Sequence, residues 1–341
     1  MRKLVYWNKT SLVLAAVLYL LIFLVRYEQG GWEPDLDLFL DVRTRLDQRI
    51  SQLLPSPQAE LLSGILLGNK KDLPPALKLA LRDTSTLHIV VASGQNLSMV
   101  AGFFLSLAGL IKRRHAIILS LIAVTAYVLL TGGQVPILRA AIMFTLASFA
   151  QIYGRQNTGW WVLMITAALM LLINPKWILD LSFQLSFLAT FGVVVVSPLL
   201  LKFLRKFPLL GQDLAVTLAA QLMVAPVIAA NFHQISLVSL LANTLILWTI
   251  PFIMILGVLM LFLGALVSLA VSVFLTYFIY IVGFFASLPF AWEYIGEQVW
   301  VVWVGYYLVV VGILMAINLS LRDHEVAKQS IAEDCHANRS Q

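Results

Sequence analysis

The sequence predicts an all-α membrane protein, a polytopic transmembrane helix bundle of about ten crossings with broken or re-entrant helices. Of its 341 residues, 60% are hydrophobic and 12% are charged, whereas a soluble globular chain carries about 25% charged residues. The mean hydropathy is +0.90. A transmembrane helix needs about 20 apolar residues, so the chain has room for roughly a dozen crossings and little extramembrane structure. This composition excludes a soluble enzyme.

The first predicted element is a signal-anchor helix. Three basic residues precede the apolar run 11–25, and no small-residue cleavage site follows it. Acidic residues outnumber basic ones in the next segment, and because positive charge collects in cytoplasmic loops, we expect this segment outside the cytoplasm. The predicted divisions are a signal-anchor helix at 1–27, an extracytoplasmic amphipathic segment at 28–58, a membrane domain at 59–320 and a disordered cytoplasmic tail at 321–341.

Hydrophobic runs predict the remaining elements. The apolar pieces at 59–67 and 76–82 are too short to span, which predicts re-entrant or interfacial helices. The basic cluster 112–115 marks the cytoplasmic side, and the alternation of loop charges around it puts both termini in the cytoplasm. No charged residue lies between 214 and 292, so loop charge leaves the number of crossings there open. The predicted crossings are 11–25, 88–111, 116–130, 135–152, 160–173, 178–201, 214–230, 236–261, 268–288 and 299–319.

Two charged side chains lie inside predicted crossings. A charge at the centre of a membrane helix costs about 2.5–3.5 kcal/mol on insertion scales, so such residues are functional candidates. Arg139 and Asp180 lie at similar shallow depths from the outer ends of their crossings, and we expect them to pair. The alternative is that each side chain reaches the outer interface alone.

Polar and small residues form a stripe on the predicted helix 88–111. At 100° per residue, His88 and Gln95 share this stripe, and Asn96 lies on its edge. A polar stripe lines an aqueous path or allows another helix to approach closely, and the combination of imidazole and amides favours the path.

In the predicted crossing 178–201, polar and aromatic side chains share a face. Asp180 and Gln184 lie on it with Phe187 and Phe191. Aromatic rings there stack bases of a nucleic-acid strand or pack ordinarily within the bundle, and the sequence leaves both interpretations open. The candidate residues for a polar path are His88, Ser93, Gln95, Asn96, Arg139, Asp180, Gln184 and Asn243.

Motifs for catalysis are absent from the sequence. The five histidines form no HxH or HExxH pattern, and the single cysteine, Cys335, excludes an intramolecular disulfide or a cysteine metal cluster. No GxxxxGK[ST] motif occurs, so transport requires a partner or a gradient. We therefore expect no enzymatic activity, no cofactor and no metal.

Several segments resemble the competence domain of ComEC-type DNA-internalisation proteins. One of these segments departs from the family pattern: the family commonly has Ser-Gly-Leu-His, whereas this chain has Ser93-Gly94-Gln95-Asn96, so a titratable role at Asn96 does not carry over. The resembling segments are, in order, LLSGILLGNKKDLP (61–74), HIVVASGQNLSMVAG (88–102), GGQVPILRAAIM (132–143), ILDLSFQLSFLATFG (178–192) and LLAN (240–243).

The resemblance implies a channel in the cytoplasmic (inner) membrane that passes single-stranded DNA inward during natural transformation. Full-length members usually add a soluble oligonucleotide-binding-like domain and a metallo-β-lactamase-like domain, and this chain is expected to be a minimal form without them. The expected partners are single-stranded DNA, the lipid bilayer, a separate cytoplasmic ATPase and a separate nuclease, with the pore formed by one chain or by a homodimer.

Two alternatives share the same sequence features. A small-molecule or lipid transporter or flippase would also be a broken-helix bundle with sparse intramembrane charge. A membrane scaffold that transports nothing is the third interpretation. Dependence of the phenotype on supplied DNA separates the DNA channel from the small-molecule or lipid transporter.

Overall fold

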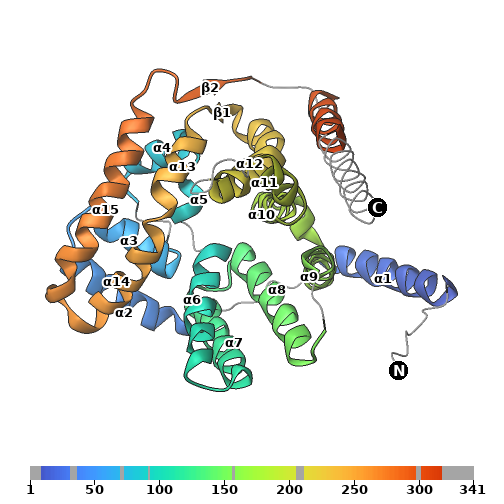
Figure 1. Cartoon of the computed structure of the whole chain (residues 1–341), viewed down its shortest axis with the longest axis horizontal. Helices are drawn as coiled ribbons and strands as arrows, with labels where there is room; N and C mark the ends of the chain where they lie inside the picture. Colours follow the sequence, from blue (N-terminus) through green and yellow to red (C-terminus); the bar gives the residue numbers. More distant parts are fainter. Residues whose placement is uncertain are drawn as a thin grey trace, which may run out of the picture.

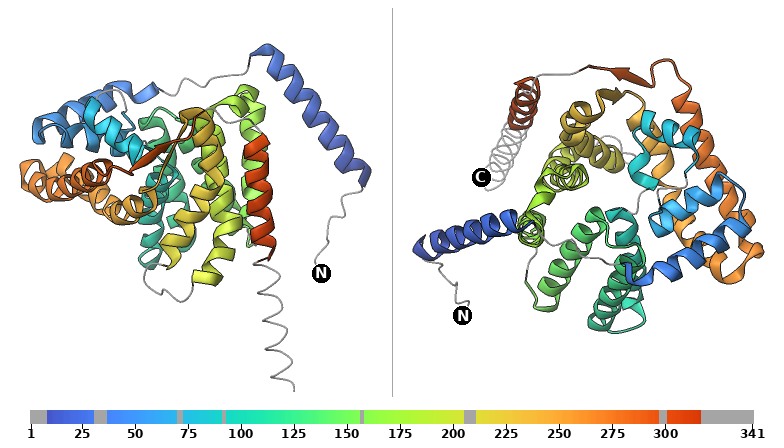
Figure 2. Two further views of the ribbon diagram at one scale, coloured as in Figure 1. Left: turned by 90° about the horizontal axis from the view of Figure 1, so that it is seen from above. Right: turned by 180° about the vertical axis from the view of Figure 1, so that it is seen from behind.

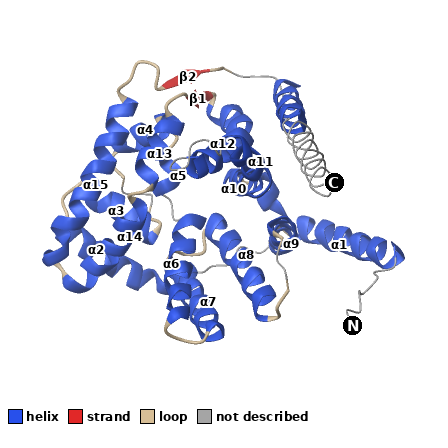
Figure 3. Cartoon of the chain, in the orientation of Figure 1, coloured by secondary structure: helices blue, strands red, loops and turns tan. Residues whose placement is uncertain are grey.

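The computed structural model describes residues 9–30, 37–69, 73–90, 93–155, 158–204, 211–296 and 301–316. Within these ranges the chain is almost entirely helical (Figure 3), which confirms the all-α prediction. Strands β1 (Gln234–Ser236) and β2 (Trp292–Tyr294) form one short antiparallel pair. The predicted disordered tail at 321–341 lies outside the described residues.

The helices follow one another with short connections. The first half of the chain contains α1 (Lys9–Gln29), α2 (Leu40–Leu53), α3 (Gln58–Leu67), α4 (Pro75–Asp83), α5 (Leu87–Val90), α6 (Gly94–Ser106), α7 (Arg113–Leu130), α8 (Val135–Ile152) and α9 (Gly159–Ile173). The second half contains α10 (Leu181–Phe191), α11 (Ser197–Leu204), α12 (Gly211–Phe232), α13 (Ser239–Leu247), α14 (Ile250–Leu263), α15 (Ala265–Ala286) and a helix at Val301–Ala316. Short 3-10 turns lie at Asp37–Phe39, Leu107–Gly109 and Pro175–Leu179, and a π-helical turn lies at Gly192–Val196.

Five helices in the described residues are long and apolar enough to cross a membrane, and the bent pair α13–α14, with a 45° change of direction, raises the number to six. The predicted count of about ten crossings is not confirmed. Between 17% and 33% of the residues in the five spans are buried inside the protein, so most residues of these spans keep some surface that lipid can contact. The five spans are Arg113–Leu130, Val135–Ile152, Leu181–Lys202, Leu214–Phe232 and Ala265–Ala286.

The largest hydrophobic core joins helices from opposite ends of the sequence. In Figure 1, α2–α5 pack against α13–α15. At its centre is α3, whose ten residues extend about 15 Å at 1.5 Å per residue. Leu61, Leu62 and Ile65 are completely buried there. The prediction that 59–67 is too short to span is confirmed, and the core of this half is therefore built around a short interior helix.

The other helices form a row beside this core. Figure 2 shows α10, α12 and the helix Val301–Ala316 running side by side. The hydroxyls of Tyr306 and Tyr307 donate to the carbonyls of Leu222 and Met223 in α12 at 3.1 and 2.8 Å. At the other end of the row, α1 contacts α9, where Arg26 Nε donates to the Leu172 carbonyl at 3.0 Å. The terminal helices thus attach at the periphery.

The predicted continuous helix over 88–111 is wrong. The chain leaves α5 at Val90 and begins α6 at Gly94, and between them Ser93 has an extended backbone with φ −113° and ψ 166°. The Ser93 hydroxyl accepts a hydrogen bond from the Asn96 amide at 3.4 Å, as serine does at the start of a helix. Because His88 and Gln95 lie on different helices, the single stripe expected from a continuous helix does not exist.

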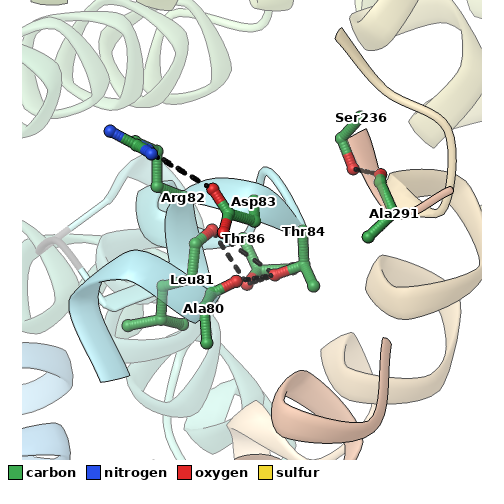
Figure 4. Close-up of polar contacts among 8 residues, drawn as sticks. All are labelled: Ala80, Leu81, Arg82, Asp83, Thr84, Thr86, Ser236 and Ala291. Atoms are coloured by element: carbon green, nitrogen blue, oxygen red, sulfur yellow. Dashed lines mark hydrogen bonds and ion pairs between the residues drawn. The ribbon is translucent and has the colours of Figure 1, made fainter. Parts of the chain in front are cut away.

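The corner before this break is held by buried threonines (Figure 4). Thr84 and Thr86 are fully buried, and their hydroxyl oxygens lie 2.8 Å apart. Thr84 Oγ1 also donates to the Ala80 carbonyl at 2.8 Å, and the Thr86 amide donates to the Leu81 carbonyl at 2.8 Å, which closes the end of α4. In the same view, the Ser236 hydroxyl donates to the Ala291 carbonyl at 3.2 Å and ties β1 to the residue just before β2.

Candidate functional site

The helix α3 ends inside the protein, so its final carbonyl groups need donors from elsewhere. The last four carbonyls of an α-helix have no partners within the helix. Asn96 Nδ2 donates to the Ile65 carbonyl at 2.9 Å, and Gln134 Nε2 donates to the Gly68 carbonyl at 2.9 Å. Two side-chain amides, one from α6 and one from the residue before α8, therefore hold the end of α3. We call this meeting point of α3, α6, α8 and α10 the junction.

Glycine residues allow the backbones at the junction to approach closely. A Cβ atom on Gly64 would lie 2.6 Å from Val90 Cγ1 and 2.9 Å from the Val90 carbonyl oxygen. Gly68 ends α3 with φ +73°, the left-handed conformation that glycine adopts at little cost. Helices α3 and α5, separate in sequence, therefore pack directly against each other.

Arg139 brings a buried positive charge to the junction. Its side chain is 9% exposed. Nη1 donates to the Ser186 carbonyl of α10, and Nη2 lies beside Gly94, where an added Cβ would be 2.9 Å away. Nε is buried without a hydrogen-bond partner. A buried ion normally has a counter-charge, because desolvation is expensive.

The expected pair between Arg139 and Asp180 does not form. Asp180 lies just before α10, and its Oδ1 accepts a hydrogen bond from the Phe183 amide at 2.8 Å. The carboxylate therefore satisfies one of the free amides at the start of the helix. Arg139 instead contacts α10 at Ser186, between one and two turns further along. The two residues lie at similar distances from the outer ends of their predicted crossings, but their charged groups do not form an ion pair.

The remaining candidates on α10 pack locally. Gln184 Nε2 donates to the Ile178 carbonyl at 2.9 Å. The rings of Phe183 and Phe187 are 4.3 Å apart, and Phe191 lies 5.7 Å from Trp160 in an edge-to-face arrangement. The structure thus shows Phe187 and Phe191 in aromatic contacts within the bundle.

The other sequence-predicted residues are divided between the junction and more distant positions. Ser93 and Gln95 are at the start of α6, with the Gln95 side chain exposed. His88 is exposed on α5, and its Nδ1 lies 2.9 Å from the Ser85 carbonyl oxygen. Asn243, on α13, is 3% exposed, and its Oδ1 has no partner. Among the hydrogen bonds of the described residues, none links His88 or Asn243 to the junction.

Sequence reasoning missed Gln134 and Gly94 at the junction. The available sequence signal for Gln134 was its position immediately before the helix that starts at Val135, where a polar side chain precedes an apolar run. Nothing in the local pattern identifies its acceptor, because Gly68 is 66 residues away. Gly94 was visible within a recognised motif, but its closeness to Arg139 depends on tertiary packing.

Two apolar hollows lie elsewhere on the described surface. One, of about 350 Å³, lies between α15, α4 and the residues just before α3. It is lined by Ser56, Pro57, Pro74, Ala76, Leu77, Ala80, Ile279 and Gly283. The other, of about 610 Å³, is lined by Thr158, Gly159, Trp160, Phe191, Val194 and Val195. Neither includes a charged side chain, so the junction is the better candidate site.

Replacing Asn96 with alanine is expected to destabilise the protein. The change leaves the Ile65 carbonyl without its Asn96 donor in a buried position, which costs about 1–3 kcal/mol in the free energy of unfolding. Thermal unfolding in detergent, followed by tryptophan fluorescence, measures the effect. Gln95→Ala is the matched control, because Gln95 is exposed on the same turn. Equal unfolding midpoints for the two variants would contradict a structural role for Asn96.

These features define the class of the protein: a polytopic α-helical membrane protein with broken helices that meet at a polar junction. The family described as Competence protein matches residues 65–320. The chain belongs to this family, which confirms the resemblance found in the sequence.

Curated relatives are longer than this chain. ComE operon protein 3 from Bacillus subtilis (strain 168) is 29% identical over 218 residues, which cover 62% of this chain and 27% of that protein. Uncharacterized protein YcaI from Escherichia coli (strain K12) is 29% identical over 224 residues, covering 59% of this chain and 28% of the relative. The chain thus spans less than a third of the length of these relatives. No solved structure matches it.

Proposed function

We propose that this chain forms a membrane channel that passes single-stranded DNA into the cytoplasm. Membership of the competence protein family and the five or six candidate membrane spans support this proposal. The channel lies in the cytoplasmic membrane with both termini in the cytoplasm. A separate ATPase drives the strand, a separate nuclease removes its complement, and the domain itself provides the passage without catalysis. The pore is formed by one chain or by a homodimer.

The single observation that carries the proposal is the burial of Arg139 at the junction without a carboxylate partner. Among the described residues, no Asp or Glu forms an ion pair with it. A membrane protein retains such a charge for a functional reason. The phosphates of a DNA strand supply the missing negative charge. A neutral lipid or a cationic substrate would leave the arginine uncompensated.

The exposure of the candidate side chains supports a path for the strand. His88 and Gln95 are exposed and line the path on either side of the break between α5 and α6. Ser93, Asp180 and Gln184 shape it by holding the helix ends beside it. Asn96 and Asn243 are buried and support the path from behind. Few fixed charges suit a moving polyanion, because binding must be weak enough to allow exit.

Conductance measurements on the full chain in a planar bilayer test the proposal. We expect single-stranded DNA, added to the outer face, to block the current transiently, while double-stranded DNA and buffer leave it unchanged. Folded protein that conducts but does not respond to DNA, or that remains closed, would contradict a DNA channel. A parallel assay for movement of labelled lipid between leaflets of vesicles tests the flippase alternative, which predicts lipid transfer without any effect of DNA.

A further inference from the structure

We infer that Arg139 and the N-terminus of α6 together form a binding site for one phosphodiester group of the translocating strand. The inference rests on the proposed function and adds to it a specific site and its chemistry. The ligand is the backbone phosphate, so the site binds DNA without preference for sequence.

The first observation is the set of free donors at the start of α6. This helix has 13 residues. The Asn96 amide donates to the Ser93 hydroxyl at 3.4 Å, and the Leu97 amide donates to the Ser93 carbonyl at 3.2 Å. The amides of Gly94 and Gln95, at the first two positions of α6, have no carbonyl partner within the helix and lie at its positive end, which attracts anions.

The second, independent observation is the Arg139 side chain. It is 9% exposed, and Nη2 lies against Gly94 at the same helix end. Its Nε is buried and has no partner. A cation beside the positive end of a helix is unfavourable by itself. An anion that contacts both groups removes this repulsion and supplies the counter-charge that the described residues lack.

A phosphodiester has the charge and the acceptor atoms that these donors require. It carries one negative charge and two non-bridging oxygens, which match the planar fork of a guanidinium together with backbone N–H groups. Gly94 allows the guanidinium to lie this close to the helix end, because a Cβ there would lie 2.9 Å from Nη2 and 3.2 Å from Ala140 Cβ. Inorganic phosphate and phospholipid headgroups share the chemistry, and the test must separate these sources from the strand.

The test uses the full chain in nanodiscs of phosphatidylcholine and a fluorescent 12-mer of deoxythymidine. Binding is measured as a function of salt concentration. For single strands the slope of log K against log salt falls by about 0.7 for each phosphate that the protein no longer neutralises. We expect Arg139→Gln to reduce the slope by this amount, Arg139→Lys to retain most of it, and a methylphosphonate oligonucleotide to bind both wild type and Arg139→Gln weakly and equally. Arg82→Gln, which removes an exposed cation paired with Asp83, is the control and should leave the slope unchanged.

The failures of the site and of the proposed function are distinguishable. Wild-type protein that does not bind the 12-mer contradicts the proposed function. Wild-type protein that binds with the same slope as folded Arg139→Gln overturns the site alone. If adding phosphatidylglycerol to the discs abolishes the difference between the two proteins, the site holds a lipid headgroup and the assignment to the strand is wrong.

A measurement on wild type keeps the inference testable if Arg139→Gln does not fold. The thermal midpoint in phosphatidylcholine nanodiscs is compared in the presence of the 12-mer and of its methylphosphonate form at equal ionic strength. Of the two oligonucleotides, we expect only the phosphodiester form to raise the midpoint. Inorganic phosphate should raise it less than this oligonucleotide does, because it lacks the rest of the strand. Equal midpoints with the two oligonucleotides would overturn the site.

Discussion

Replacing Arg139 with alanine is expected to lower DNA uptake by about tenfold to a hundredfold while leaving the amount of protein in the membrane within about twofold. The change removes a charge-assisted hydrogen bond, which contributes about 1.5–3 kcal/mol, and each 1.4 kcal/mol corresponds to a factor of about ten. It also removes the hydrogen bond to the Ser186 carbonyl. Transformation frequency, normalised to protein abundance in the membrane fraction, measures the effect.

The control for this prediction is Arg139→Lys, which keeps the charge but not the planar fork. We expect an intermediate uptake. Equal losses of uptake and abundance in Arg139→Ala would assign a structural role to Arg139. A phenotype that persists without added DNA would instead favour a transporter of another substrate.

Replacing Gly192 with alanine is expected to destabilise the helix row strongly. A Cβ on Gly192 would lie 2.4 Å from the Ala219 carbonyl oxygen and 2.9 Å from its carbonyl carbon. Both atoms belong to the backbone of α12, so a side-chain rotation cannot relieve the clash. Overpacking of this kind costs about 1–3 kcal/mol in the free energy of unfolding. Membrane abundance and the thermal midpoint of the purified protein should both fall.

The matched control is Gly102→Ala, a glycine inside α6 with no atom within 4 Å of an added Cβ. This change should be neutral or slightly stabilising, because alanine is the better helix former. A similar fall in abundance for both variants would show that the close packing of the π-helical turn on α12 is not the cause. Gly192 begins the π-helical turn, so the same experiment tests whether that turn depends on the contact.

Hydrophobicity predicted most helices because lipid imposes a simple local rule. Val135–Ile152 matches the predicted crossing, and Arg113–Leu130 begins three residues before the predicted one. The rule failed at 88–111, where the run is apolar enough overall for a membrane helix but Ser93 starts a new helix with its own hydroxyl. Hydropathy does not distinguish a continuous helix from two helices separated by a capped break, since both are equally apolar.

The candidate site was likewise predicted from the sequence only in part. Arg139 was identified from sequence, because an arginine in an apolar run is rare. Its partner was predicted wrongly: depth along a helix is a local quantity, whereas the direction of a side chain depends on the helix it faces. Asp180 satisfied its own helix end, and Arg139 met Ser186.

By itself, the sequence determined the all-α membrane class, the resemblance to the competence family and the presence of Arg139 within a crossing, because composition, motif order and insertion cost are properties of local residues. Only the tertiary structure decided that α3 is an interior helix whose end meets α6 and α8 and that Arg139 lies beside Gly94. The hydrogen bonds involved join residues separated by 31, 66 and 47 positions. Such contacts arise from unsatisfied carbonyls and close glycine packing between helices, which no local pattern encodes.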